Sequence, residues 1–73
     1  MKQTINQTFQ KAITFHKEGR LKEAESLYRS ILEVDSGYVN AYNNLGVALN
    51  ELGRPEESEK ILKKAIEINP NYA

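Results

Sequence analysis

Residues 41–54 read AYNNLGVALNELGR, and they raise a question about Gly46. The large apolar residues of this stretch recur at spacings of three and four: Tyr42, Leu45, Leu49 and Leu52. This spacing predicts an amphipathic helix. A glycine in a helix interior costs about 1 kcal/mol relative to alanine, and no turn signal follows until Gly53. Gly46 therefore needs a compensating reason.

The stretch belongs to the second of two copies of one pattern. When the sequence is aligned with itself at an offset of 34 residues, identical residues coincide without a gap: Asn6 with Asn40, Gly19-Arg20 with Gly53-Arg54, Glu23 with Glu57, Glu25 with Glu59, Glu33 with Glu67, and Tyr38 with Tyr72. Similar apolar residues fill the positions between them. A fixed period of this length is typical of repeat proteins. We expect one domain, residues 1–73, with a first repeat at 5–38 and a second at 39–72.

Each repeat divides into two helices at its Gly-Arg pair. Gly53 suits the position after a helix C-terminus, and Pro55 suits the first turn of the helix that follows. The periodicity predicts four helices, at about 3–18, 21–34, 39–52 and 55–68. No strand pattern interrupts them, so the predicted fold class is all-α.

These residues resemble the tetratricopeptide repeat family. In the second repeat, the family's conserved positions are matched by Tyr42, Leu45-Gly46, Ala65 and Pro70. The first repeat keeps Ala12, Phe15, Gly19, Ala24 and Tyr28 but has Thr8, Lys11, Ile31 and Ser36 where the family usually has other residues. The resemblance implies two tandem helix-turn-helix repeats. Their four antiparallel helices would form a fragment of a right-handed α-solenoid.

The resemblance also offers a reason for Gly46. In this family the two helices of a repeat pack against each other, and a residue without a side chain lets them approach closely. The expected small partners are Ala24, Ser58 and Ala65, and Ala12 takes the place of glycine in the first repeat. The alternative is that Gly46 only kinks its own helix.

Composition excludes several classes of protein. The 73 residues carry 10 Lys and Arg against 10 Asp and Glu, so net charge gives no electrostatic basis for binding nucleic acid or an anionic membrane. There is no cysteine for a disulfide or a thiolate metal site. The N-terminal residues lack the apolar core of a signal peptide, and no apolar run is long enough to cross a bilayer. We expect a cytoplasmic chain without cofactors.

Catalytic residues are not evident. His16 is the sole histidine, and its place near a helix end suggests a solvated surface residue. The tyrosines occupy repeat positions, which favours packing over base stacking. We expect no enzymatic activity within these residues.

The resemblance implies a protein or extended peptide as partner, bound along the concave face formed by the first helix of each repeat. The expected contact residues are Asn6, Phe9, Gln10, Ile13 and Lys17 in the first repeat, and Asn40, Asn43, Asn44, Val47, Asn50 and Glu51 in the second. An amide both donates and accepts hydrogen bonds, so asparagines can hold a peptide backbone without reading its sequence. Alternatively, these asparagines are merely exposed polar residues.

Two comparisons within the family refine this expectation. Asn44 is similar in place to the asparagine ladder of the O-linked N-acetylglucosamine transferases. Phe9 and Ile13 stand where the family's chaperone-tail clamp has lysine and asparagine, so that clamp is not expected here.

The C-terminal edge leaves a further question open. The sequence stops at a repeat boundary, and family members usually have a further helix covering the last repeat. We therefore expect Leu45, Leu62, Ile66 and Tyr72 to face water. One alternative is a homodimer through this edge. The other is that the chain is the N-terminal arm of a larger transferase, which its opening residues resemble.

Overall fold

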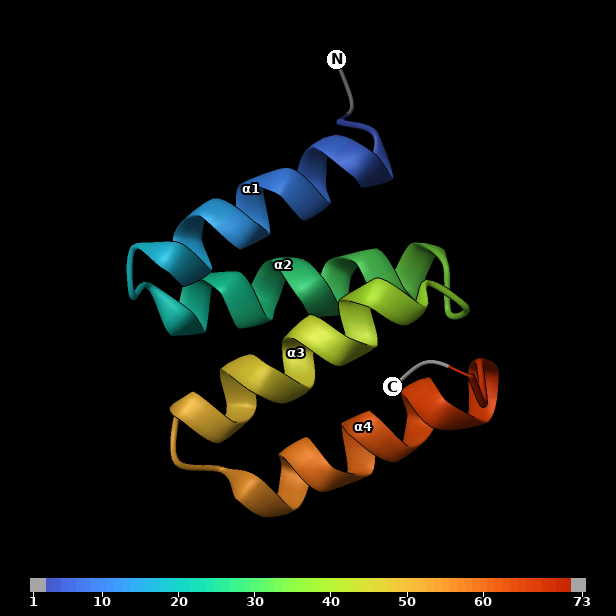
Figure 1. The fold of residues 1–73 in the computed structure, drawn as a ribbon. Coiled ribbons are helices and arrows are strands. Elements are labelled where there is room, and N and C mark those ends of the chain that lie inside the picture. The colour runs from blue at the N-terminus through green and yellow to red at the C-terminus, as the bar shows by residue number, and fades with distance from the viewer. Residues whose placement is uncertain (1–2, 72–73) are drawn as a thin grey trace.

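The computed structural model describes residues 3–71 and has four α-helices (Figure 1). They are α1 (Ile5–Lys17), α2 (Leu21–Val34), α3 (Val39–Glu51) and α4 (Pro55–Ile68). No strand occurs in the part of the chain that the structure describes. The predicted all-α class and all four helices are confirmed, with the first helix three residues shorter than expected and the third helix one residue shorter.

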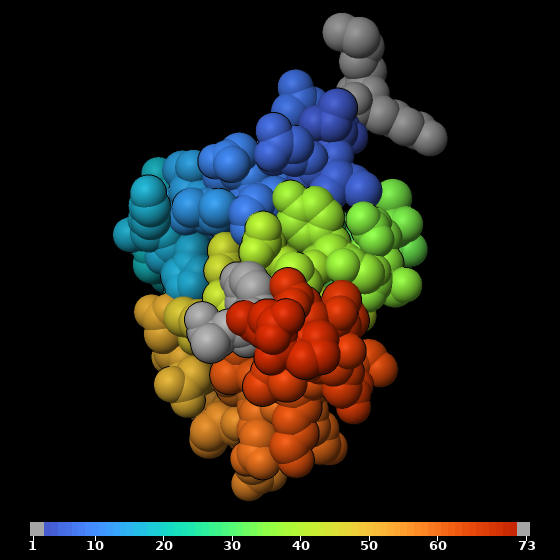
Figure 2. Space-filling view, turned by 45° about the vertical axis from the view of Figure 1, so that its right-hand side comes forward, coloured from blue at the N-terminus to red at the C-terminus, as the bar shows by residue number. Residues whose placement is uncertain are grey.

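The helices lie side by side in chain order, and neighbours run antiparallel (Figure 1). Extensive contacts link α1 with α2, α2 with α3, and α3 with α4. The first helices of the two repeats, α1 and α3, therefore run in the same direction. In Figure 2, the blue surface of α1 and the orange surface of the start of α4 lie at opposite ends of the molecule, and the red end of α4 lies nearer the middle.

The Gly-Arg pairs make the same turn in both repeats. Gly19 and Gly53 have positive φ angles of 79° and 80°, a conformation that glycine adopts without steric cost. The N–H of the following arginine, Arg20 or Arg54, donates to the carbonyl five residues earlier at 2.9 Å in both turns. The same local sequence thus ends α1 and α3 in the same way and sets the direction of α2 and α4.

The core is built where α3 packs against the first repeat. Its largest fully buried side chains are Tyr28, Ile31, Leu45 and Leu49. Alanines at 12, 24, 41 and 48 are fully buried among them and allow the helices to approach closely. The expectation that Leu45 faces water was wrong, because α3 packs this residue toward α2. Ile66 is exposed as expected, Leu62 is half-buried, and Tyr72 lies outside the described residues.

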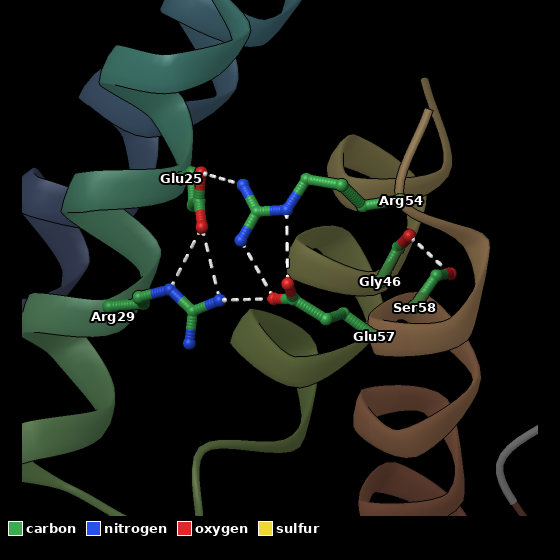
Figure 3. A network of polar contacts seen from close by, with 6 residues as sticks. All are labelled: Glu25, Arg29, Gly46, Arg54, Glu57 and Ser58. Carbon is green, nitrogen blue, oxygen red and sulfur yellow. Dashed lines mark hydrogen bonds and ion pairs between the residues drawn. The ribbon is translucent and has the colours of Figure 1, made fainter. Parts of the chain in front are cut away.

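Gly46 lies at the closest approach of α3 and α4. A Cβ atom built on Gly46 would lie 2.5 Å from Cδ2 of Leu62, a distance that real Cβ atoms do not adopt. Ser58 Oγ donates a hydrogen bond to the Gly46 carbonyl at 2.6 Å (Figure 3). The predicted close approach is present, but the side chain that occupies the space is Leu62, beside the small Ser58.

A four-residue ion-pair network joins the two repeats across α2 and the start of α4 (Figure 3). Glu25 accepts hydrogen bonds from Arg29 at 3.0 Å and from Arg54 at 2.9 Å. Glu57 accepts from Arg54 at 2.7 Å and from Arg29 at 3.4 Å. Burial alone would raise the pKa of the Glu25 carboxyl, but its bonds to Arg54 and Arg29 outweigh burial and hold that pKa below its ordinary value.

We expect Gly46→Ala to lower the free energy of unfolding by about 1–3 kcal/mol, because the added methyl group forces Leu62 from its place. Urea unfolding followed by circular dichroism measures this change. The matched control is the same substitution in a Leu62→Ala chain, where the space is open. There the higher helix propensity of alanine should make Gly46→Ala neutral or stabilising by up to about 1 kcal/mol. A stabilising effect in the unmodified chain would contradict the steric explanation.

The ion-pair network makes stability depend on pH in the acidic range. Because the pKa of Glu25 is lower in the folded chain than its ordinary value of 4.5, its contribution is present above that pH and is lost as pH falls through the folded value. Glu25→Gln should lower the free energy of unfolding at pH 7 by about 1 kcal/mol. It should also lessen the further loss between neutral and acidic pH.

Urea unfolding at a series of pH values tests this expectation. The control is Glu33→Gln, which removes an exposed carboxylate from the same helix but outside the network. If the free energy of unfolding depended on pH equally in the two variants, Glu25 would contribute no more to that dependence than an exposed carboxylate.

Candidate functional site

The exposed sides of α1 and α3 carry matching sets of residues. At the offset of one repeat, Asn6 corresponds to Asn40, Gln10 to Asn44, Ile13 to Val47, and Lys17 to Glu51. Spacings of three and four residues place each set on one side of its helix. Because α1 and α3 run in the same direction in successive repeats, both sets lie on the same side of the molecule. We call these eight residues, with Asn43 and Asn50, the α1–α3 face.

Most predicted contact residues are accessible on this face. Asn6, Gln10, Lys17, Asn40, Val47, Asn50 and Glu51 are exposed, and Ile13, Asn43 and Asn44 are half-buried. The exception is Phe9, which is 8% exposed. Its ring lies 5.3 Å from that of Tyr38 and 6.1 Å from that of Tyr28, centroid to centroid. The prediction that Phe9 is a surface contact residue was therefore wrong, because Phe9 is a core residue beneath the face.

His16 connects three helices, and its expected solvation was wrong. Its side chain is 17% exposed. Nδ1 lies 3.3 Å from the Tyr28 hydroxyl on α2, and Nε2 lies 2.5 Å from Oε1 of Glu51 on α3. One signal could have found this contact. Glu51 follows His16 by one repeat plus one residue, which is the spacing of lateral neighbours on two parallel first helices.

Tyr28 and Asn44 continue this polar cluster. Burial raises the pKa of the Tyr28 hydroxyl, and the smaller effect of its hydrogen bond with the Asn44 amide opposes that rise. One assignment satisfies every group: Asn44 donates to Tyr28, Tyr28 donates to Nδ1 of His16, and Nε2 of His16 donates to Glu51. We call these four residues the His16 cluster. It fixes the orientation of Asn44 and of Glu51, two residues of the α1–α3 face.

The α1–α3 face has hydrogen-bonding amides around a small aliphatic centre. Ile13 and Val47 supply the apolar surface, and the exposed fraction of Val47 is 43%. The Glu51 carboxylate accepts a hydrogen bond from His16 and keeps its negative charge, which Lys17 of the same face balances. Within residues 3–71, no group of three or more His, Asp or Glu side chains is placed to hold a metal ion. The same residues include no helix that is both long and apolar enough to span a membrane.

Comparison with known proteins gives two matches. Residues 15–73 match a family profile described as the tetratricopeptide repeat. The chain is also 36% identical over 50 residues to the human (Homo sapiens) protein named tetratricopeptide repeat protein 7A. That alignment covers 68% of this chain and 6% of the human protein. The chain therefore spans a small part of the relative's length.

Tyr28→Phe tests whether the His16 cluster stabilises the junction between repeats. The substitution keeps the ring against Phe9 but removes the hydroxyl that contacts His16 and Asn44. We expect the free energy of unfolding to fall by about 1 kcal/mol, with a shift in the NMR signal of the Asn44 side-chain amide. Tyr38→Phe, at a half-buried tyrosine that also packs on Phe9, is the matched control. Equal effects of the two substitutions would show that the cluster contributes nothing.

Proposed function

Because the chain belongs to the tetratricopeptide repeat family, we propose that it is a non-catalytic module that binds a protein partner through an extended peptide along the α1–α3 face. Repeats of this family generally mediate protein–protein interaction. In this family the first helices of the repeats are expected to line the concave side of the array, and the α1–α3 face is formed by these helices.

The observation that carries the proposal is the duplication of the face. Two amides, one β-branched aliphatic residue and one ionisable residue recur in the same order on α1 and α3. An extended peptide is itself periodic and presents backbone donors and acceptors at regular intervals. Amides at matching positions on successive helices suit such a backbone, because each can donate and accept. Ile13 and Val47 suit an apolar side chain between the two contacts.

The charges on the face favour a peptide of low net charge. Lys17 and Glu51 are of opposite sign, and the Glu51 carboxylate lies against His16. The face has no excess of one sign of charge, so it would not attract a strongly acidic or a strongly basic segment. We therefore propose an uncharged, amide-bonded ligand rather than nucleic acid or an anionic surface.

A second candidate is that the chain acts as the targeting arm of a larger protein, for instance a transferase. The coverage of the human relative favours it, since the aligned segment there is 6% of a long chain. The α1–α3 face would then bring a substrate protein to an activity located elsewhere. In either case we propose that the chain acts in the cytoplasm.

Selection from a library of random peptides against the immobilised chain tests the proposal. Peptides of about 12 residues are long enough, because extended chains rise about 3.3 Å per residue and the molecule is 34 Å in its longest dimension. We expect two variants to raise the dissociation constants of the selected peptides at least about tenfold. One is the double substitution Gln10→Ala with Asn40→Ala, and the other is Val47→Asp. Fluorescence anisotropy of labelled peptides measures the dissociation constants.

The controls are Asn69→Ala and Val34→Asp, which remove an exposed amide and an exposed valine away from the face. These substitutions should leave binding unchanged. Peptides that bind all of the variants equally would refute the α1–α3 face as the binding site.

A further inference from the structure

A hollow lies at the edge formed by α3 and α4. Its volume is about 490 Å³, and its lining includes Val47, Pro55, Glu59, Leu62, Lys63 and Ile66. Ile66 is 53% exposed. We call these six residues the α3–α4 edge. The hollow adjoins the α1–α3 face, because Val47, Asn50 and Glu51 of that face also line it.

The repeat offset shows what kind of surface this edge is. Thirty-four residues earlier, the corresponding positions lie on α1 and α2, where the second repeat packs. Tyr28 there, the counterpart of Leu62, is fully buried. Glu25 and Arg29, the counterparts of Glu59 and Lys63, pair with Arg54 and Glu57 in the ion-pair network. The α3–α4 edge therefore corresponds to a surface that holds α3 in the first repeat, and within residues 3–71 no helix packs on it.

A second copy cannot occupy the edge in the way that α3 occupies the first repeat. The α3 residues fully buried in that junction are Ala41, Leu45, Ala48 and Leu49. Their counterparts on α1 are Gln7, Lys11, Thr14 and Phe15. Placing α1 of a second copy against the edge would bury the Lys11 ammonium at the position of Leu45, and a buried charge without a partner is costly. Head-to-tail stacking of copies is thus opposed by the polar surface of α1.

Two copies of the edge complement each other instead. Glu59 and Lys63 lie one turn apart on α4, with 3.6 Å between the carboxylate and the ammonium. If two α4 helices pack antiparallel about a two-fold axis that passes between these residues, each Glu59 faces the Lys63 of the other copy. The same axis brings each Ile66 near the opposite Pro55, so the apolar ends are covered as well. A two-fold interface needs a self-complementary patch of this kind.

We propose that the α3–α4 edge is a self-association surface, on which a second copy of this chain packs edge to edge in a two-fold dimer. The proposal goes beyond peptide binding and is tested without any peptide, so its failure would leave the proposed function untouched. A contact made mainly by one helix from each copy buries little surface, and small interfaces are weak. The dimer contact is made mainly by Glu59, Lys63 and Ile66 of α4, whereas Val47, which belongs to both surfaces, lies on α3.

Sedimentation equilibrium of the full chain, from about 5 to 500 μM, tests the proposal over the range expected for a small interface. We expect a reversible monomer–dimer equilibrium. Ile66→Glu should abolish the dimer over this range, and the control Val34→Glu should leave it unchanged. Val34 is 75% exposed on α2, away from the edge. Circular dichroism of each variant verifies that it remains folded.

Charge reversal at the edge supplies a test that loss of folding cannot imitate. Glu59→Lys alone and Lys63→Glu alone put like charges opposite each other across the two-fold axis. Each should raise the dissociation constant of the dimer about tenfold. The double variant restores opposite pairs across the two-fold axis and should recover the original dissociation constant. Failure of the double variant to recover would overturn the antiparallel arrangement.

Three further results would overturn the proposal. The first is a monomer at every concentration. The second is an open series of larger species, which would mean head-to-tail stacking. The third is a monomeric chain that is stabilised by a synthetic peptide of residues 38–54, which would mean that the edge takes a helix from another protein.

Discussion

The constraint on which this structure depends is that neither two-helix repeat can bury its apolar side alone. Helices can share that burial only if their backbones approach closely, and small residues at the crossings permit this approach. Gly46 serves this purpose between α3 and α4, where its carbonyl accepts the hydrogen bond of Ser58. The buried alanines serve it at the other junctions. The parallel placement of α1 and α3, and hence the duplicated α1–α3 face, follows from these crossings.

The junction between the repeats is held by polar contacts at two separate places. The ion-pair network links α2 to the start of α4, and the His16 cluster links α1 and α2 to α3. Within the described residues, no buried side-chain donor or acceptor lacks a partner. The apolar core between these contacts supplies most of the stabilisation, because exposed ion pairs contribute little. The polar contacts favour one arrangement of the repeats, since each contact requires a particular register of one helix on another.

Much of the fold follows from periodicity within single helices. The 34-residue offset and the two Gly-Arg pairs predicted the number of helices and their ends to within two residues. Gly46 predicted the close approach of α3 to α4. The environments of Phe9, His16 and Leu45 were not predicted, because they depend on which residues of another repeat lie across the junction. Helical periodicity divides a helix into sides, but it does not show which side a later helix covers. The family relationship is shown, whereas the contacts of the α1–α3 face with a ligand remain predictions.

The order of contacts in this molecule has a mechanical consequence. Among the described residues, extensive packing joins only helices that are consecutive in the chain, so most contacts close short loops and cost little entropy. A chain of this kind can begin to fold in either hairpin and add the other. When its two ends are pulled apart, helices can separate from one end in turn, because no extensive contact ties α1 directly to α4. Under force, the chain should therefore extend in steps, one helix at a time, rather than unfold as a single unit.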